Sequence, residues 1–367
     1  MRGRARRASA LFGVVVVVAA LATTPLWWGG GGAAVPRRVH LPWPWAATVE
    51  ARPPGPAALV FETDQTRYFE ATTVVVGRNG KYRIREQVLG HVRGTVSPDG
   101  RLLLDGFDRI LDLTTGEIRH LPGGMLMGWS RDGRTVVALG NNGAVNLVDV
   151  ASRQTRTIYA DAGVLNDALA VSPDGSKVVV PVYHENDRRL ALVDATKNVV
   201  WSVPAARYLM ADAIVFSPDG RYVATTVDRC VAAQRNCPEP GHGRAVVLDA
   251  ATGAEVASYA PADRVLGFRG DGLVLARWGA DENTLVQVGP GGERTLVTMD
   301  AEAGGPDVPL DLVEHGAFGG ADAVPNPLAA PTWCYVLLGL LALPFVPRPR
   351  RAASRVSSPS TPAARTP

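Results

Sequence analysis

Short apolar runs separated by turn residues recur through the middle of the chain. In the clearest copy, an apolar stub at residues 215–216 leads into a Ser-Pro-Asp-Gly turn at residues 217–220, and the apolar run 222–224 follows at once. Proline presets φ at the first corner, aspartate bonds its own backbone, and glycine accepts the positive φ that reverses the chain. The pattern therefore predicts a β-hairpin at each copy.

Five such turns occur in phase. Their aspartates are Asp99, Asp132, Asp174, Asp219 and Asp271, at intervals of 33, 42, 45 and 52 residues. Most of these turns are followed by an apolar run that ends in aspartate, a second turn and a last strand-like run, which makes four strands per unit. A four-stranded unit of this period cannot bury both of its faces alone, so units pack around a common axis. The chain is therefore predicted to be all-β, a β-propeller of four-stranded blades.

The turns resemble those of the WD-repeat-like β-propeller family whose units begin with Ser-Pro-Asp-Gly, as in the periplasmic propeller of the Tol system. The resemblance covers residues 57–320. The units lack the Trp-Asp dipeptide of the eukaryotic WD type, so the peptide-binding habits of that branch are not implied. The aspartates themselves are expected to form turns, because one carboxylate per blade cannot supply the clustered oxygens that calcium requires.

The first unit lacks one strand. Residues 57–61, 72–76 and 82–85 have the pattern of strands two, three and four, and no first strand precedes them. After the last unit, the strand-like piece Leu310–Glu314 remains alone. We expect this piece to fill the vacancy, so that the two ends of the domain close the ring in one blade. On this count six blades are favoured, and seven are possible.

Apolar segments flank the repeats. Residues 10–28 follow a basic start and are long enough to span a bilayer, although a cleaved signal peptide fits the same pattern. Residues 331–347 form a second apolar stretch, followed at once by a run of arginines. Positive residues favour the cytoplasmic side, so two transmembrane helices would hold the propeller at the cell membrane on the extracytoplasmic side with both termini cytoplasmic.

The predicted organisation has seven parts. They are a basic cytoplasmic N-terminus (1–9), a transmembrane helix or signal peptide (10–28), a Gly/Pro/Trp linker (29–56), the β-propeller (57–320), a linker (321–330), a transmembrane helix (331–347) and a disordered basic cytoplasmic tail (348–367). The net charge of +3 is concentrated in the tails and does not indicate a nucleic-acid partner. Arginine supplies nearly all the positive charge, which is typical of a GC-rich bacterial genome.

The cysteines suggest one crosslink. Cys230 and Cys237 flank a short stretch between strands two and three of the fifth blade, where an exported loop favours a disulfide. Free thiols are one alternative. A zinc site is the other, but it needs two further ligands, and His242 is the only obvious one nearby. We predict no metal and no cofactor.

A polar cluster marks the candidate binding surface. It lies between strands two and three of the fourth blade, and the corresponding connection of the sixth blade is also polar. Corresponding connections of a propeller emerge on one face, where loops on a rigid scaffold collect recognition residues. Tolerated surface insertion is the competing interpretation. The candidate binding residues are His184, Glu185, Asp187, Arg188, Arg277 and Asp281.

Catalytic signatures are absent from the sequence. It contains no Gly-x-Ser-x-Gly, no His-Glu-x-x-His and no phosphate loop. The preferred function is therefore a binding or scaffold module for a protein or cell-envelope ligand, without catalysis of its own. The alternative is a cell-envelope hydrolase or lyase with its site at the propeller channel. That alternative requires carboxylates or histidines from three or more blades to converge in one pocket.

Overall fold

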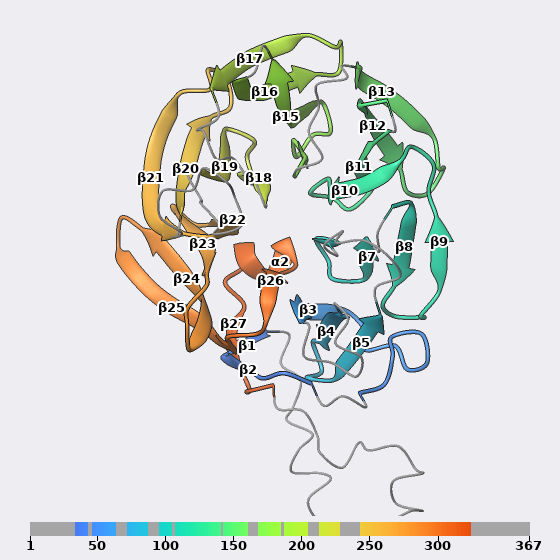
Figure 1. Cartoon of the computed structure of the whole chain (residues 1–367), viewed down its shortest axis with the longest axis vertical. Coiled ribbons are helices and arrows are strands. Elements are labelled where there is room, and N and C mark those ends of the chain that lie inside the picture. Colours follow the sequence, from blue (N-terminus) through green and yellow to red (C-terminus); the bar gives the residue numbers. More distant parts are fainter. Residues whose placement is uncertain are drawn as a thin grey trace, which may run out of the picture. The chain divides into compact units, whose positions relative to one another are not determined.

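The computed structural model contains a six-bladed β-propeller. It describes residues 34–42, 46–63, 72–86, 95–104, 107–140, 142–160, 168–184, 187–204, 213–227 and 243–323, all of which belong to one compact unit. Within these residues, six sheets of four or five strands surround a common axis, with the first strand of each blade nearest the axis and the last at the rim (Figure 1). The predicted all-β propeller and the count of six blades are confirmed, and the alternative of seven is wrong.

Blades two to five follow the order of the chain. Blade two comprises β6 (Thr95–Val96), β7 (Leu102–Leu104), β8 (Arg109–Asp112) and β9 (Ile118–His120). Blade three comprises β10 (Met125–Trp129), β11 (Thr135–Leu139), β12 (Ala144–Asp149) and β13 (Thr155–Ala160). Blade four comprises β14 (Ala170–Val171), β15 (Lys177–His184), β16 (Asp187–Asp194) and β17 (Val199–Pro204). Blade five comprises β18 (Ile214–Phe216), β19 (Tyr222–Val227), β20 (Gly243–Asp249) and β21 (Glu255–Ala262).

The ring closes between blades six and one. Blade six comprises β22 (Arg264–Arg269), β23 (Gly272–Arg277), β24 (Glu282–Gly289) and β25 (Gly292–Asp300), with β2 (Arg38–Val39) added outside. Blade one combines β26 (Gly304–Asp307) with β3 (Ala57–Thr63), β4 (Thr72–Gly77) and β5 (Tyr82–Glu86). The two ends of the domain therefore share one blade, as the sequence predicts.

The identity of the closing strand differs from the prediction. Leu310–Glu314 forms the helix α2, which follows Pro309, and the strand that fills the vacancy is β26. β26 pairs antiparallel with β3, with Gly304 opposite Glu62 and Asp307 opposite Val60. In α2 the adjacent residues Leu312 and Val313 are both buried, which an alternating strand with one solvent-facing side does not allow. This piece therefore packs against the ring as a helix and does not pair as a strand.

The segment expected to be a linker takes part in the sheets. β1 (Val35–Pro36) pairs parallel with β27 (Phe318–Gly320), and β2 pairs parallel with β25. Further along, Thr48 bridges Ile84 of β5. The chain therefore covers the outer edges of blades six and one with its own backbone, and it enters and leaves the ring side by side.

The repeated turns have the chemistry that the sequence implies. In blade five, Ser217 Oγ donates to Asp219 Oδ1 at 2.7 Å, and the Tyr222 N–H donates to Ser217 Oγ at 2.9 Å. Gly220 has a φ of +72°, in the left-handed region that favours glycine. The aspartates of blades two, three and four accept the same serine hydroxyl bond. These aspartates are therefore turn formers.

The apolar core lies between neighbouring blades. One cluster joins Leu192 of blade four to Val223 and Leu248 of blade five, and the other clusters join successive blades in the same way. Each sheet buries an apolar face against the neighbouring sheet, and this close packing keeps the ring rigid. This rigidity holds the inner strands in fixed positions around the axis.

The predicted membrane segments do not belong to the part of the chain that the structure describes. Within this part of the chain, no helix is both long and apolar enough to cross a membrane. The predicted spans at residues 10–28 and 331–347 lie outside the described residues, as do Cys230, Cys237 and Cys334.

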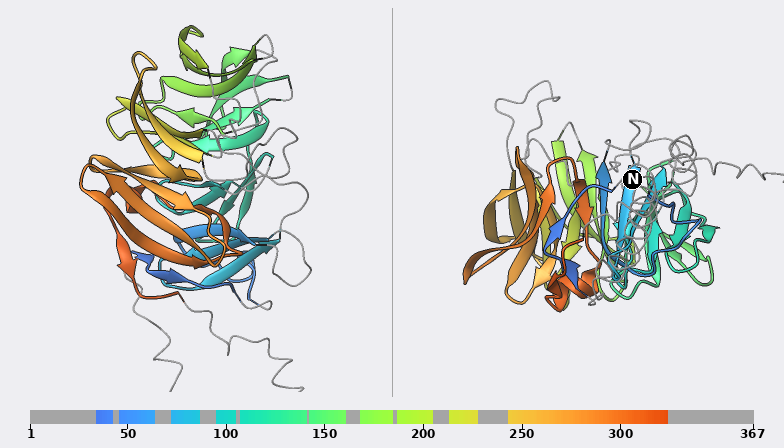
Figure 2. Two further views of the ribbon diagram at one scale, coloured as in Figure 1. Left: turned by 60° about the vertical axis from the view of Figure 1, so that its left-hand side comes forward. Right: turned by 90° about the horizontal axis from the view of Figure 1, so that it is seen from below.

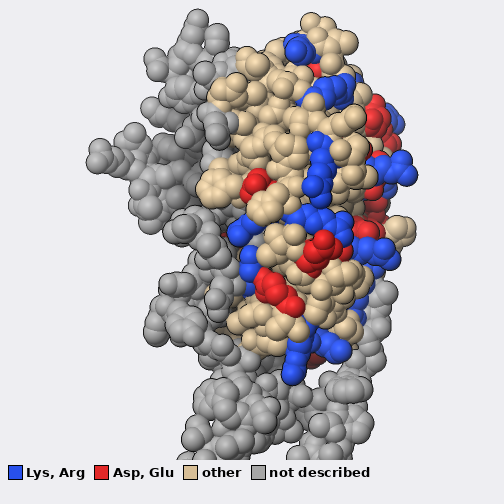
Figure 3. All heavy atoms as spheres, turned by 90° about the vertical axis from the view of Figure 1, so that its right-hand side faces the viewer, with Lys and Arg blue, Asp and Glu red and all other residues tan. Residues whose placement is uncertain are grey.

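On the side of the ring drawn in Figure 3, cationic and anionic side chains are interspersed rather than gathered into fields of one sign.

Candidate functional site

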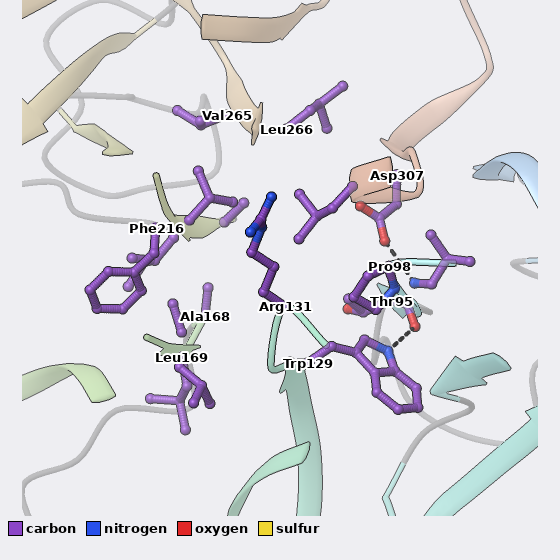
Figure 4. A pocket seen from close by; sticks show the side chains of 18 of the residues that line it. Thr95, Pro98, Trp129, Arg131, Ala168, Leu169, Phe216, Val265, Leu266 and Asp307 are labelled. Atoms are coloured by element: carbon purple, nitrogen blue, oxygen red, sulfur yellow. Dashed lines mark hydrogen bonds between the residues drawn. The ribbon is translucent and has the colours of Figure 1, made fainter. Parts of the chain in front are cut away.

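A cavity of about 110 Å³ lies along the central channel. Inner strands from all around the ring form its walls (Figure 4). Most of the lining is apolar, and representative residues from successive blades are Val96, Met127, Leu169, Phe216, Leu266 and Val308. A hydrogen bond between neighbouring blades supports this wall, because Trp129 Nε1 of blade three donates to the carbonyl of Thr95 in blade two at 3.1 Å.

Four charged side chains interrupt this apolar lining. They are Arg131, Arg264, Asp307 and Glu314. Both carboxylates come from the closing segment 304–314 and no histidine lines the cavity among the described residues, so acidic groups of three or more blades do not converge there. Within the described residues, the constellation named for the hydrolase or lyase alternative is not assembled in this cavity.

Arg131 occupies a special position in the repeat. Pro98, Pro173 and Pro218 stand at the equivalent position in blades two, four and five. Arg131 instead reaches over the channel: its Nε donates to Glu314 Oε1 at 2.9 Å, its Nη2 bonds the other carboxylate oxygen, and its Nη1 reaches the carbonyl of Pro218 at 3.4 Å. The bond to Glu314 raises the pKa of Arg131. One departure from the repeat thus joins blades three and five to α2.

Asp307 joins three blades from inside the channel. Its Oδ2 accepts the N–H of Val96 in blade two at 2.8 Å. Its Oδ1 lies 4.0 Å from Arg264 Nη2 in blade six, and the two side chains are 14% and 5% exposed. Burial raises the pKa of the Asp307 carboxyl, although the Arg264 charge and the N–H groups of Val96 and Val308 act in the opposite direction. The Arg264 and Asp307 side chains are therefore buried together at the seam where the ring closes.

Helix α2 closes one end of the channel. Asp311 Oδ2 accepts Arg78 Nη2 of blade one at 2.7 Å, and the Asp311 N–H donates to the carbonyl of Pro98 at 3.1 Å. On blade six, Gly267 leaves room for the helix, since a Cβ there would lie 2.9 Å from Val313 Cγ1. The helix lies at the face that carries the Ser-Pro-Asp-Gly turns (Figure 2, right).

A shallower hollow lies on the outer side of this closure. It measures about 310 Å³ and is lined by residues of the turns and of α2. Arg131 and Glu314 line both this hollow and the inner cavity. The Arg131–Glu314 pair and α2 are therefore the partition between the channel and the solvent at this face.

The two faces of the ring differ in their connections. At the α2 face, the turns between the first and second strands of blades two to five all have the serine and aspartate bonds described above. At the opposite face, the connections between the second and third strands vary from residues 185–186 in blade four to 228–242 in blade five. We call this face, which carries connections of different length between the second and third strands, the variable face.

The candidate residues of blade four lie in a hairpin rather than in a loop. β15 and β16 extend until His184 pairs with Asp187, and Arg188 pairs with Tyr183. The second and third strands of this blade are thus long, because the cross-strand ladder continues through the polar residues. Glu185 lies outside the described residues.

The candidate residues of blade six have different surroundings. Arg277 forms a two-pronged pair with Glu293, with Nη1–Oε1 and Nη2–Oε2 distances of 2.6 and 2.8 Å, and its Nε donates to the carbonyl of Pro261 at 2.7 Å. Arg277 therefore supports the outer strands of the ring. Asp281 is exposed in the connection between β23 and β24. Blade five separates this blade from the blade of His184, so the structure does not bring the two groups together.

The charged residues of the channel were not found from the sequence. Arg264, Asp307 and Glu314 lie in no motif, and they meet only because the ring closes. The one available signal is Arg131, which replaces the proline of its repeat. In the described residues, no group of three or more His, Cys, Asp or Glu side chains could hold a metal ion.

Comparison with known proteins identifies no family. No protein-family model and no curated protein matches the sequence. Among solved structures, the chain is similar to TolB from Acinetobacter baumannii, with a TM-score of 0.48 and 16% identity over 69% of this chain and 66% of that chain. It is also similar to Kuenenia stuttgartiensis hydrazine synthase (TM-score 0.42, 16% identity, 70% and 77% coverage) and to the β-propeller domain of Myceliophteria thermophila Cps50 (Swd1) (0.40, 13%, 64% and 81%). The chain thus spans just under two thirds of the TolB chain, and at these identities the likenesses concern the β-propeller fold alone.

Proposed function

We propose that this chain is a membrane-anchored, extracytoplasmic β-propeller that binds a protein or cell-envelope ligand and has no catalysis of its own. The observation that carries the proposal is the difference between the two faces of the ring. One face is made of uniform, internally bonded turns and is closed by α2, whereas the other carries connections of very different length. Variable connections on a rigid scaffold are the usual place of recognition.

The closed face is poorly suited to selective binding. Its serine and aspartate side chains bond to each other and to the local backbone, so their hydrogen-bonding capacity is largely used within each turn. At the variable face, Asp281 is exposed and the Phe107 side chain is 54% exposed. The backbone beside this ring is held in place, because the carbonyl groups of residues 107 and 108 accept the N–H groups of Leu126 and Leu121. Aromatic side chains are enriched in the interfaces at which proteins bind their partners.

The path of the chain fits attachment to a membrane at one corner. The backbone enters the ring at β1 and leaves it at β27, and these two strands pair with each other. Both apolar stretches predicted to span the membrane, residues 10–28 and 331–347, would therefore connect to the ring at this corner. The arginines that flank the stretches favour a cytoplasmic location for both termini and an extracytoplasmic one for the ring.

Topology is tested by cysteine labelling. In a chain whose native cysteines are replaced by serine, Arg134→Cys places a thiol at a position whose side chain is 82% exposed, and Ser358→Cys places one in the predicted tail. A membrane-impermeant maleimide should label Arg134→Cys in intact spheroplasts and Ser358→Cys only after permeabilisation. Labelling of Arg134→Cys only after permeabilisation would overturn the extracytoplasmic location.

The binding face is tested by site-specific crosslinking in intact cells. A photo-crosslinking side chain at Asp281 reports on the variable face, and the same side chain at Arg134 is the control on the closed face. Discrete adducts to a protein or to envelope material are expected from Asp281 and not from Arg134. Adducts from Arg134 alone would show that the closed face binds and would contradict the proposal.

A further inference from the structure

The size of the channel cavity suits a small molecule. Its volume of about 110 Å³ is somewhat below that of an apolar cavity of roughly 150 Å³ that accommodates benzene. The cavity therefore admits at most about one aromatic ring or an aliphatic group of similar bulk. α2 closes the end of the cavity near the turns, and Thr95 and Ala168 line the wall at the other end.

The lining favours an apolar body. Met127, Leu169, Phe216 and Leu266 approach the cavity from four blades, and Figure 4 shows Phe216 and Leu266 on different sides of it. Water in such a space would need two to four polar partners per molecule, and the aliphatic walls offer few. The displacement of water from these walls by an apolar group is favourable.

The charges of the lining balance. Arg131 is paired with Glu314, and the buried Arg264 faces Asp307. An arginine keeps its proton at any ordinary pH. The Arg264 charge and the N–H groups of Val96 and Val308 favour the carboxylate form of Asp307, against the effect of its burial. With all four groups ionised, the lining carries two positive and two negative charges. An ionised ligand would add a buried charge that nothing in the lining offsets.

We propose that the channel cavity is a binding site for a small, uncharged, amphipathic ligand, with an apolar body against the inner strands and one hydrogen-bonding group toward the Arg264 and Asp307 wall. This site lies inside the ring and does not depend on the membrane topology or on a partner at the variable face. The small ligand would be bound in addition to the protein or envelope component proposed to bind at the variable face.

Three probes of similar size separate the charge classes. Benzyl alcohol is uncharged, benzoate is an anion near pH 7, and benzylamine is a cation at that pH. Calorimetry or ligand-observed NMR with the purified full-length protein should give saturable binding of benzyl alcohol. Binding of the other two should be at least ten times weaker, because each brings an unbalanced charge into the channel.

Variants that fill the cavity locate the site. Ala168→Phe and Ala213→Phe each add a ring to the lining from adjacent blades and should weaken benzyl alcohol binding at least tenfold. Ala151→Phe adds the same ring to an exposed turn and should leave binding unchanged. The unfolding midpoint of each variant establishes that it is folded, and a crystal of the unaltered protein soaked with benzyl alcohol gives a readout that needs no variant.

Three results would overturn the proposal. One is the absence of saturable binding by any probe together with no density for benzyl alcohol in the channel. The second is equal binding by the unaltered protein and by folded cavity-filling variants, which would place the probe on the surface or in detergent. The third is tighter binding of benzoate or benzylamine than of benzyl alcohol, which would show that the channel takes an ion.

Discussion

Arg131 Nε donates to Glu314 Oε1 across 2.9 Å, and this bond links two residues that lie 183 positions apart in the chain. It connects a repeat turn of blade three to the helix that closes the channel. Because Glu314 is 15% exposed, the pair is partly withdrawn from water and is more than a surface contact. Arg131, a departure from the repeat, therefore adds a contact to α2 beside the Arg78–Asp311 pair and the packing of Val313 against Gly267.

Arg131→Ala should loosen α2. The substitution leaves the carboxylate of Glu314 without its guanidinium partner, and we expect a loss of about 1 kcal/mol in the free energy of unfolding, since Arg131 itself is 41% exposed and screened. Hydrogen exchange should accelerate across residues 310–316. Arg134→Ala is the control, because that side chain is 82% exposed and 4.0 Å from Asp132. Equal exchange rates in both variants would contradict the role of the pair.

Gly253→Ala should cost more than Gly175→Ala. Both glycines have positive φ, +75° and +69°, so both substitutions carry a backbone cost of about 1 kcal/mol. At Gly253 the new Cβ would also lie 2.9 Å from the ring of Trp201 in blade four, whereas nothing lies within 4 Å at Gly175. We expect a further loss of about 1–2 kcal/mol at Gly253 in urea unfolding. Equal losses would mean that the contact between blades four and five tolerates an added methyl group.

Ser217→Ala should change both the stability and the acid response of blade five. The hydroxyl is buried, donates to Asp219 and accepts the Tyr222 N–H, so its loss should cost about 1–2 kcal/mol at pH 7. The serine hydroxyl bond is the first cause that holds the pKa of Asp219 below its ordinary value. NMR titration of the variant should therefore show a higher pKa for Asp219 than in the unaltered protein.

The sign of the pH dependence follows from that lowered pKa. A carboxyl group whose pKa is lower in the folded state stabilises the fold above its unfolded pKa, about 3.9, and loses this contribution as the pH falls through the folded value. The difference in unfolding free energy between the unaltered protein and Ser217→Ala should therefore shrink below pH 4. A constant difference between pH 7 and pH 3 would show that the carboxylate plays no part.

Arg277→Ala distinguishes a supporting residue from a binding residue. Arg277 is 15% exposed on its side chain and pairs with Glu293 on the outer strand, so its removal should lower the stability of blade six by about 1 kcal/mol. Asp281→Ala changes an exposed position and should leave the unfolding midpoint within about 0.5 kcal/mol. Unchanged stability in Arg277→Ala would restore this side chain as a candidate for ligand contact.

The blades were predictable because their turns are local. Serine, aspartate and glycine within five residues determine each hairpin, and the apolar runs beside them need no distant partner to be recognised. The same reasoning identified strands 57–61, 72–76 and 82–85 of blade one, which the structure places in β3, β4 and β5. The repeated turns and the apolar runs beside them are therefore sufficient to predict the propeller architecture.

The closure and the channel were not predictable for the opposite reason. Gly304–Asp307 has no apolar alternation, and it becomes a strand only because β3 offers an unpaired edge. Leu310–Glu314 alternates like a strand, but five residues are too few to distinguish a strand from a helix that packs into the channel. Arg264 and Asp307 meet across the seam of the ring, so neither carries a signal in the linear sequence.

Tyr82→Phe should weaken the place where the chain enters and leaves the ring. The Tyr82 hydroxyl is buried, donates to the carbonyl of Ala323 at 2.6 Å and accepts the His40 N–H at 3.2 Å, and burial raises the pKa of this phenol. Phenylalanine keeps the ring but removes both bonds, so we expect a loss of about 2 kcal/mol in unfolding free energy. Exchange should accelerate at residues 35–41 and 318–323 and stay unchanged in blades three and four, because the bonds are confined to this corner.

A second tyrosine supplies the control for that measurement. Tyr222 lies with its ring 5.6 Å from the guanidinium carbon of Arg221, and Tyr222→Phe keeps this ring in place. Its effect on unfolding should stay within about 0.5 kcal/mol. If Tyr82→Phe behaved like Tyr222→Phe, the parallel pairing of β1 with β27 and of β2 with β25 would be sufficient to hold the two ends. If Tyr82→Phe instead accelerated exchange in every blade, the bonds of Tyr82 would stabilise the closure of the whole ring rather than one corner of it.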